Sequence, residues 1–316
     1  MHTSPGVGSY RDGVGRAARA PKAFTLVELL VVIGIVALLV AILLPSLNRA
    51  RQMADGIKCA SNLRQIAVGW VMYANGNNGT ACPGRPPKLP APATNVYAVG
   101  NGDQFRPRWF VTLGAESGVF AYAQPSPDPA DDNTKHVDNP VFVCPTEQER
   151  TNNRNYTYGY NHQFLGNARQ RAASAGFINF PVKISRIRAS DTVMAADAMG
   201  TAAGKPKSAR TAYRPDGGGD VNAVGNHAWS LDPPRLTPTS DYCDDTNRAP
   251  QHRSAPDPRH GGRANVAFCD GHVEAMTLQD LGYVVNADGS VPAAAPGAHN
   301  RMFSGNAEDL DPPPIN

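Results

Sequence analysis

Residue types that bind metals lie close together in the last fifth of the chain, at Cys269, His272 and Glu274. Thiolate, imidazole and carboxylate groups bind zinc and iron in proteins, so these residues are candidates for a metal site, with His260 nearby in the sequence. Neither a helical His pair nor a Cys-x-x-Cys pair accompanies them. The simpler interpretation is that these residues lie on the exposed face of a hairpin. We therefore assign no metal, and a zinc site is the alternative interpretation.

The pattern around these residues predicts the β-hairpin that would position them. Asp270-Gly271 separates two β-like runs, and a two-residue type I′ turn requires φ > 0 at both central positions, which favours Asp and Gly. The predicted cross-strand pairs are Cys269 with His272, Phe268 with Val273, and Val266 with Ala275. Because cross-strand partners share a face, one side should be apolar and the other should carry the metal-ligand types. The predicted apolar side consists of Val266, Phe268, Val273 and Ala275.

Two other patterns could bind ligands. Tyr156, Tyr158, Tyr160 and His162 alternate with small polar residues, as in a stacking platform for sugars or bases, although a strand that packs its tyrosines inward is the more frequent arrangement. The Asp-rich loops Asp216 to Asp220 and Asp241 to Asp245 are candidates for calcium, but their spacing fits no EF-hand. No P-loop, Gly-x-Ser-x-Gly or His-Glu-x-x-His motif is present, so no catalytic residue is assigned.

A long apolar run near the N-terminus contains a single carboxylate. From Phe24 to Leu44 there are 21 residues whose only charge is Glu28. At 1.5 Å per residue they form a helix about 31 Å long, which matches the hydrocarbon thickness of a bilayer. A cleaved signal peptide has an apolar core of roughly 7–15 residues, so we expect a retained anchor. Basic residues precede the run, and the positive-inside rule places the N-terminus in the cytoplasm and the remainder outside.

Glu28 requires a physical explanation within this anchor. An ionised carboxylate deep in a spanning helix costs about 2.5–3.5 kcal/mol on insertion scales, and less near the interface. Cleavage between Ala23 and Phe24 would create an α-amino group four residues before Glu28, at a similar depth. An adjacent copy of the chain could offer that amine to the carboxylate.

The segment from Lys22 to Glu28, followed by an apolar helix with Pro45 at its far end, resembles the processing site of type IV prepilins and type II secretion pseudopilins. The resemblance implies that a prepilin peptidase cleaves after Ala23 and N-methylates Phe24. It also implies that Glu28 neutralises the N-terminal amine of an adjacent subunit during assembly. The residue before the cut is usually glycine in that family, and Ala23 is the closest substitute in size.

Two further segments resemble prepilin-like proteins of planctomycete-type bacteria. One is Cys59-x-x-Asn62-Leu63-Arg64-Gln65, which follows the anchor. The other runs from His260 to Asp270-Gly271 and matches the H-X9-DG motif found near the C-terminus of those proteins. The motif has no assigned biochemical role within that family.

A second helical pattern follows Pro45. Apolar residues recur at spacings of three and four, which predicts an amphipathic continuation over residues 46–75 that ends at Asn75 to Gly79. A coiled-coil stalk is the alternative, but the stripe lasts under four heptads and lacks regular flanking charges. The predicted apolar stripe consists of Leu47, Ala50, Met53 or Ala54, Ile57, Leu63, Ile66 or Ala67, Trp70 and Tyr73.

The remainder of the chain combines short β-like runs with Pro-, Gly- and Asn-rich loops. Such runs without intervening helices favour an antiparallel sheet, so we expect an α+β, pilin-like fold with a long N-terminal helix packed on that sheet. The expected strands are 109–113, 141–144, 156–160, 192–196, 265–269 and 272–276. The expected organisation is a leader 1–23, a transmembrane helix 24–45, its continuation 46–75, a β-rich extracytoplasmic domain 76–285 with the hairpin near 260–276, and a loosely ordered tail 286–316.

Charge and cysteine content restrict the partners. Without residues 1–23, which hold four basic residues and one acidic residue, 26 basic and 26 acidic residues remain. Such a neutral body lacks the basic surface that binding to phosphate backbones requires, so nucleic acid is not expected as a partner. The five cysteines permit up to two disulfides outside the cytoplasm, and the sequence does not assign the pairs.

These patterns together favour a pilin-like structural subunit or assembly factor of a type II secretion pseudopilus or a type IV pilus-like fibre. We expect it in the bacterial inner membrane before it is extruded in a fibre, with the prepilin peptidase and other subunits as partners. It would be a substrate of the peptidase and not itself an enzyme, and it would need no cofactor. The alternatives are a membrane-tethered metal-binding hydrolase or ligand-binding protein, and an anchored surface protein without a role in assembly.

Overall fold

The computed structural model describes residues 25–132, 134–147, 156–170, 177–178, 180–213, 219–244 and 252–315. The chain divides into two compact units, Met1–Arg49 and Ala50–Asn316. One long helix, α1 (Leu26–Gly76), contributes residues to both units. The second unit contains the sheets and the two main apolar cores.

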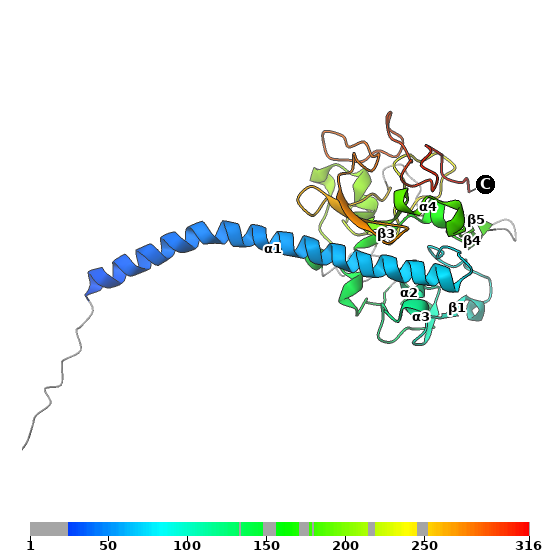
Figure 1. The fold of residues 1–316 in the computed structure, drawn as a ribbon, viewed down its shortest axis with the longest axis horizontal. Helices are drawn as coiled ribbons and strands as arrows, with labels where there is room; N and C mark the ends of the chain where they lie inside the picture. Colours follow the sequence, from blue (N-terminus) through cyan, green and yellow to red (C-terminus); the bar gives the residue numbers. More distant parts are fainter. Residues whose placement is uncertain are drawn as a thin grey trace, which may run out of the picture. The chain divides into compact units, whose positions relative to one another are not determined.

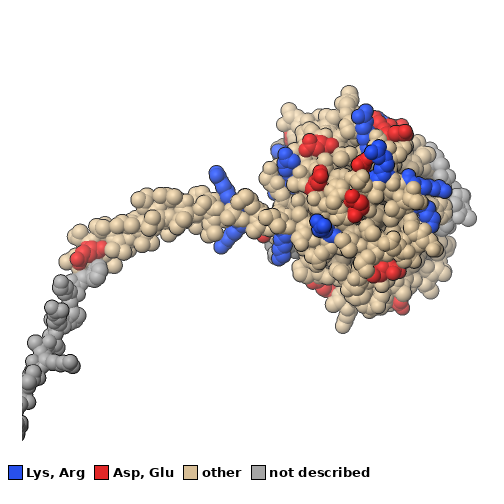
Figure 2. Space-filling view, in the orientation of Figure 1, with Lys and Arg blue, Asp and Glu red and all other residues tan. Residues whose placement is uncertain are grey.

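The first part of α1 is apolar on every side. Its large hydrophobic side chains from Leu26 to Leu44 are all at least 45% exposed. Figure 2 shows this stretch as an uncharged surface, with acidic atoms at its start and basic atoms beyond its far end. Within the described residues, α1 is the one helix long and apolar enough to cross a membrane. The helix continues through Pro45, with the Ser46 hydroxyl donating to the carbonyl of Leu43 (2.8 Å).

The later part of α1 packs on the body of the second unit (Figure 1). Its buried residues are Cys59, Asn62, Leu63, Ile66, Ala67, Gly69, Trp70 and Ala74. The predicted stripe is therefore confirmed from Leu63 to Trp70. It is wrong for Leu47, Met53 and Ile57, which are 47%, 64% and 73% exposed, although the helix already meets the body at Gly56, whose carbonyl accepts from the Asn265 side chain (3.1 Å). The helix ends as predicted, at Gly76, where Asn78 and Gly79 adopt positive φ and the Gly79 amide donates to Ala74 (2.7 Å).

The central sheet is antiparallel, with strand order β3-β6-β7-β8. Its strands are β3 (Tyr158–Tyr160), β6 (Val193–Asp197), β7 (Ala264–Phe268) and β8 (Val273–Met276). Ala195 and Ala267 belong to the same apolar core as Leu63 of α1, and their small side chains allow the helix to lie close to the sheet. Val266 and Phe268 belong to a second core with loop residues such as Phe303. The expected α+β arrangement of a long helix on an antiparallel sheet is confirmed.

Short elements surround this sheet. Two small hairpins are β1 (Val96–Ala98) with β2 (Asp103–Phe105), and β4 (Arg169–Gln170) with β5 (Phe177–Ile178). The other α-helices are α2 (Trp109–Thr112), α3 (Gly114–Ser117) and α4 (His162–Leu165). The 3₁₀ helices are Pro92–Asn95, Pro129–Asp131, Pro140–Phe142, Pro145–Glu147, Ile184–Arg186, Ala189–Asp191, Gly200–Gly204 and Lys207–Ala209.

Two expected strands are helical in the structure. The run 109–113 forms α2, since a short apolar run does not distinguish a buried helix from a buried strand. The first two residues of the run 141–144 belong to the 3₁₀ helix Pro140–Phe142. There the Asn139 side chain accepts a hydrogen bond from the Val141 amide (3.0 Å), and this cap favours the turn over an extended start.

The hairpin β7–β8 forms with a register one residue away from the predicted one. Ala267 pairs with Val273, and Val266 pairs with Glu274. The loop has three residues, because the Gly271 amide donates to Phe268 (3.0 Å) and the Phe268 amide donates to His272 (2.9 Å). Gly271 has φ of 95°, which matches a type I turn followed by a left-handed residue. A one-residue shift exchanges the faces of β8, so Val273 and Ala275 do not share a side with Val266 and Phe268.

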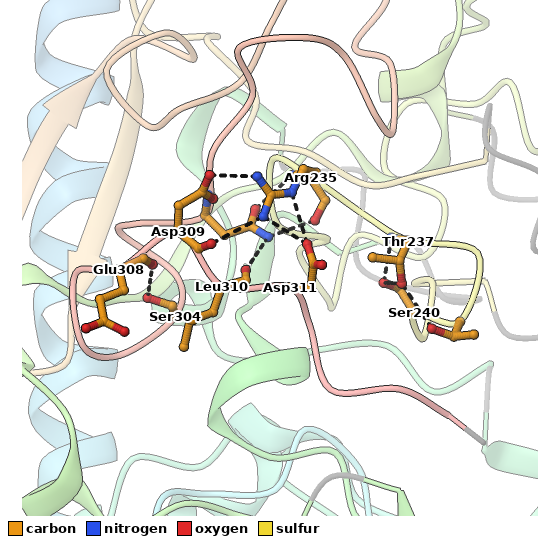
Figure 3. Close-up of polar contacts among 10 residues, drawn as sticks. Arg235, Thr237, Ser240, Ser304, Glu308, Asp309, Leu310 and Asp311 are labelled. Carbon is orange, nitrogen blue, oxygen red and sulfur yellow. Dashed lines mark hydrogen bonds and ion pairs between the residues drawn. The ribbon is translucent and has the colours of Figure 1, made fainter.

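The C-terminal segment is packed on the body, contrary to the expected loose tail. Figure 3 shows Arg235 between Asp309 and Asp311, at 2.6 and 2.9 Å. Asn300 is fully buried and bonds the backbone on both sides: it donates to the carbonyls of Arg235 and Leu310, each at 2.9 Å. Local composition did not reveal these contacts because the partners lie far apart in the sequence.

The tyrosines of β3 point into the core, as the preferred interpretation of their alternation predicted. Tyr156, Tyr158 and Tyr160 are 3%, 3% and 0% exposed, so they form no surface platform. The Tyr160 hydroxyl accepts from the Trp70 indole (3.1 Å) and donates to the carbonyl of Cys82 (2.7 Å). These two hydrogen bonds join α1, β3 and the loop that follows α1, which carries Cys82, inside an apolar core.

We expect Tyr160→Phe to lower the free energy of unfolding by about 1–3 kcal/mol, because it leaves the Trp70 N–H and the Cys82 carbonyl buried without partners. Tyr97→Phe, which removes the hydroxyl of a half-buried strand residue, should change it by less than about 0.5 kcal/mol. Denaturant unfolding of both variants, followed by tryptophan fluorescence, measures the difference. Equal stability of the two variants would contradict this account of the core.

Candidate functional site

The start of α1 forms a reciprocal hydrogen-bonded cap. The Thr25 amide and hydroxyl both donate to Oε2 of Glu28, each at 2.9 Å, and the Glu28 amide donates to the Thr25 hydroxyl (3.2 Å). This is a capping box, which satisfies backbone donors that the first turn of a helix leaves free. Glu28 is thus oriented by its own chain at the N-terminal end of the apolar helix. The predicted processing residues, Ala23 and Phe24, lie outside the described residues.

Four side chains with metal-ligand atoms converge between α1 and the sheet. They are Cys59, Cys144, Asp197 and His260, and their ligand atoms all lie within 4.8 Å of one another. Each comes from a different part of the fold: α1, the loop after Pro140–Phe142, the end of β6, and the turn before β7. The first three are fully buried and His260 is nearly so, with 8% of its side chain exposed. We call this group the Cys₂AspHis cluster.

The distances inside the cluster are short. Cys59 Sγ lies 3.2 Å from Oδ1 of Asp197, and Cys144 Sγ lies 3.4 Å from Nε2 of His260. The same Nε2 atom lies 3.4 Å from Oδ2 of Asp197. The imidazole therefore presents one nitrogen to both a thiol and a carboxylate.

Neighbouring polar groups hold the cluster residues in place. The Asn265 amide donates to Oδ2 of Asp197 (2.8 Å), and the Tyr158 and Thr146 hydroxyls lie 3.3 and 3.1 Å from the sulfurs of Cys59 and Cys144, respectively. On α1, the buried Asn62 side chain donates to the carbonyls of Pro140 and Val143, at 3.1 and 3.2 Å. Asn62 therefore fixes the loop that carries Cys144.

The cluster perturbs the ionisation of its members. Burial raises the pKa of the Cys59 thiol, and the hydrogen bond from Cys59 lowers the pKa of Cys144 to about 5. Burial acts against the charged form of His260, but the hydrogen bonds with Asp197 and Cys144 raise its pKa to about 10.

The arrangement does not match a nucleophilic triad. In a nucleophilic triad the nucleophile and the acid residue bind different nitrogens of the imidazole ring. Here Asp197 and Cys144 both face Nε2 of His260. Convergence of several ligand atoms on one point is instead what a metal ion requires.

The H-X9-DG residues have separate roles in the structure. His260 belongs to the Cys₂AspHis cluster. Asp270 accepts hydrogen bonds from the amide (3.0 Å) and Nδ1 (2.6 Å) of His272, and Gly271 supplies the positive φ of the turn. The motif therefore joins one cluster residue to the hairpin that follows it.

The residues singled out first in the sequence are not brought together as a metal site. Cys269 is buried in the core that contains α1, whereas His272 stacks on Phe268 of the other core, with ring centroids 4.2 Å apart. The one-residue register shift is the cause, since it places Cys269 and His272 on different faces. Sequence reasoning missed Cys59, Cys144 and Asp197 as site residues, although the Cys59-x-x-Asn62 segment had marked one of them.

The Asp-rich loops show no convergent carboxylates within the part of the chain that the structure describes. Asp220 accepts from the Thr211 hydroxyl (2.8 Å) and the Asn222 amide (2.9 Å), which closes a local turn. Asp241 is fully buried and accepts from the Asn167 side chain. Residues 214–218 and 245–251 lie outside the described ranges, so calcium binding by these loops stays a prediction.

Comparison with known proteins identifies the N-terminal segment. Residues 19–44 match the model of the prokaryotic N-terminal methylation motif. No curated protein and no solved structure matches the chain. The motif and the exposed apolar helix indicate a type IV pilin-like or pseudopilin-like protein, and within the described residues α1 is its one candidate membrane span. The motif also implies processing by a prepilin peptidase.

We expect Asn62→Ala to lower the free energy of unfolding by about 1–3 kcal/mol, because two backbone carbonyls beside the Cys₂AspHis cluster lose a buried donor. Asn101→Ala is the matched control, since the exposed Asn101 side chain also donates to two carbonyls, those of Tyr122 and Ala123, at 2.8 and 3.4 Å. Water can replace that donor, so its effect should be below about 0.5 kcal/mol. Paired denaturant titrations provide the test, and a control that is as unstable as Asn62→Ala would refute the assignment.

Proposed function

We propose that this chain is a pilin-like subunit or assembly factor of a type II secretion pseudopilus or a type IV pilus-like fibre in the bacterial inner membrane. The observation that carries the proposal is the methylation motif at residues 19–44, continued by an apolar helix that no described part of the chain covers. Before assembly the helix lies in lipid, with its N-terminus in the cytoplasm and the body outside. After assembly it lies among the helices of neighbouring subunits.

Exposed apolar residues beyond Pro45 favour assembly over simple anchoring. A bilayer about 30 Å thick is already spanned by the run that ends at Leu44. Leu47, Met53 and Ile57 extend the exposed apolar surface over a further 13 residues, or about 20 Å of helix. A helix that served only as a membrane anchor would leave this apolar surface exposed to water, whereas helices packed in a fibre would cover it.

Glu28 provides the electrostatic part of the proposal. In the capping box, Oε2 of Glu28 accepts hydrogen bonds from Thr25. No described cation within α1 compensates the negative charge of the Glu28 carboxylate. Processing before Phe24 would create an amine on each subunit at the same level of the helix. Pairing that amine with Glu28 of an adjacent subunit would offset the cost of burying both charges.

The surface charge is consistent with protein and membrane partners. On the face shown in Figure 2, acidic and basic residues are interspersed over the body. A mixed surface of this kind has no field that would attract nucleic acid. We assign no catalytic activity to the chain, which acts as a substrate of the peptidase. The large loop-rich body favours a minor or specialised subunit over a major fibre subunit.

We expect the mature protein to begin with N-methyl-Phe24, measured by mass spectrometry of the protein from its native membrane. Ala23→Gly should be processed at least as completely, because glycine is the usual residue before the cut. A strain that lacks the prepilin peptidase should retain the leader on the same chain. An intact leader in the native protein would remove the main support of the proposal.

We expect both Glu28→Ala and Glu28→Gln to be processed normally but to fail in assembly, measured by membrane extraction and by cross-linking between copies. Glutamine preserves the capping box with Thr25 and removes only the charge. The pair of variants therefore separates capping from charge pairing. Assembly by Glu28→Gln at the wild-type level would show that the capping bond, and not the charge, is what matters.

A further inference from the structure

The Cys₂AspHis cluster has the composition and geometry of a closed zinc site. In a tetrahedral site, Zn–S distances of about 2.3 Å and Zn–N or Zn–O distances of about 2.0–2.1 Å place ligand atoms roughly 3.3–3.8 Å apart. Three of the six pairwise separations in the cluster are 3.2, 3.4 and 3.4 Å, close to that range, and all four ligand atoms lie within 4.8 Å of one another. Four protein ligands complete the coordination that structural zinc sites use.

We propose that Cys59, Cys144, Asp197 and His260 bind one zinc ion that fastens α1 to the sheet. The ligands come from four separate elements, so the ion would join segments up to 201 residues apart in the sequence. Soft thiolate ligands select zinc over calcium or magnesium, and all four ligands are protein side chains, which leaves no open position for a substrate. The site is therefore structural, and it is independent of the proposed role in assembly.

The surroundings of the cluster support a bound cation. Donors from Asn265, Tyr158 and Thr146 reach three of the ligand side chains, as hydrogen-bonding partners do around metal ligands. Two thiolates, one carboxylate and a zinc ion leave a single net negative charge. The buried Arg259 guanidinium lies nearby, where it pairs with Asp257 (3.0 Å) and donates to the carbonyl of Ala198 (2.7 Å), so it interacts with Asp257 as well as with the cluster.

A disulfide between Cys59 and Cys144 is the competing arrangement, because the body is proposed to lie outside the cytoplasm. It would remove the S–H donor that Cys59 presents to Asp197 at 3.2 Å without placing a cation beside the carboxylate, as zinc would. It would also leave the fully buried Asp197 carboxylate and the His260 ring directed at a neutral sulfur pair. Zinc accounts for all four side chains, whereas a disulfide accounts for two.

The test uses the full processed chain, purified in detergent from zinc-supplied cells. Metal analysis should find about one zinc ion per chain. Replacement by cobalt(II) should give the visible absorption of a tetrahedral site and a thiolate-to-cobalt charge-transfer band. A metal-free wild-type chain, with a Cys59–Cys144 disulfide in non-reducing peptide maps, would overturn the proposal.

Variants locate the ion. His260→Ala and Cys144→Ser should each retain less than about a tenth of the zinc, while His260→Cys, which keeps four ligands, should retain it. His272→Ala and Cys269→Ser are matched controls from the adjacent hairpin and should bind zinc like the wild type. Zinc unchanged in both His260→Ala and Cys144→Ser, or lost equally in the controls, would refute the assignment. The wild-type cobalt spectrum decides the question even if a variant fails to fold.

Discussion

The structure depends on one constraint: the N-terminal part of α1 carries apolar side chains on all sides, and no described segment of the chain covers them. Water cannot be their resting environment, because each buried aliphatic side chain is stabilised by about 1.5–3 kcal/mol relative to exposure. The helix must therefore lie in lipid or against other chains. That requirement explains why the helix is apolar on all sides before Pro45, whereas its buried residues, from Cys59 to Ala74, lie on one side.

The body, in contrast, contains long Pro- and Gly-rich loops and little regular secondary structure. Buried polar side chains replace much of the missing strand pairing. Arg253 is fully buried and donates to the carbonyls of Pro234 (2.9 Å) and Pro292 (2.7 Å), which lie in separate loops. Asn161 similarly joins the carbonyls of Val193 and Phe303, at 2.9 and 3.0 Å. Such networks stabilise only when they are complete, so these loops are expected to tolerate few changes at the asparagine and arginine positions.

The Cys₂AspHis cluster lies between the covered part of α1 and the central sheet. Its members come from four elements, and the H-X9-DG motif supplies one of them, His260. The rest of the motif shapes the β7–β8 turn through Asp270 and Gly271.

The sequence alone determined the apolar helix, its end near Gly76, the inward-facing tyrosines of β3 and the existence of the last hairpin, because periodicity and composition act over neighbouring residues. Tertiary structure decided the helical state of 109–112, the packing of the C-terminal segment, and the register of β7–β8, where a three-residue loop moved Cys269 and His272 to different faces. It also decided the cluster. Cys59, Cys144, Asp197 and His260 are scattered over 201 residues, and no local pattern encodes their meeting, since that depends on how α1 packs against a sheet assembled from distant strands.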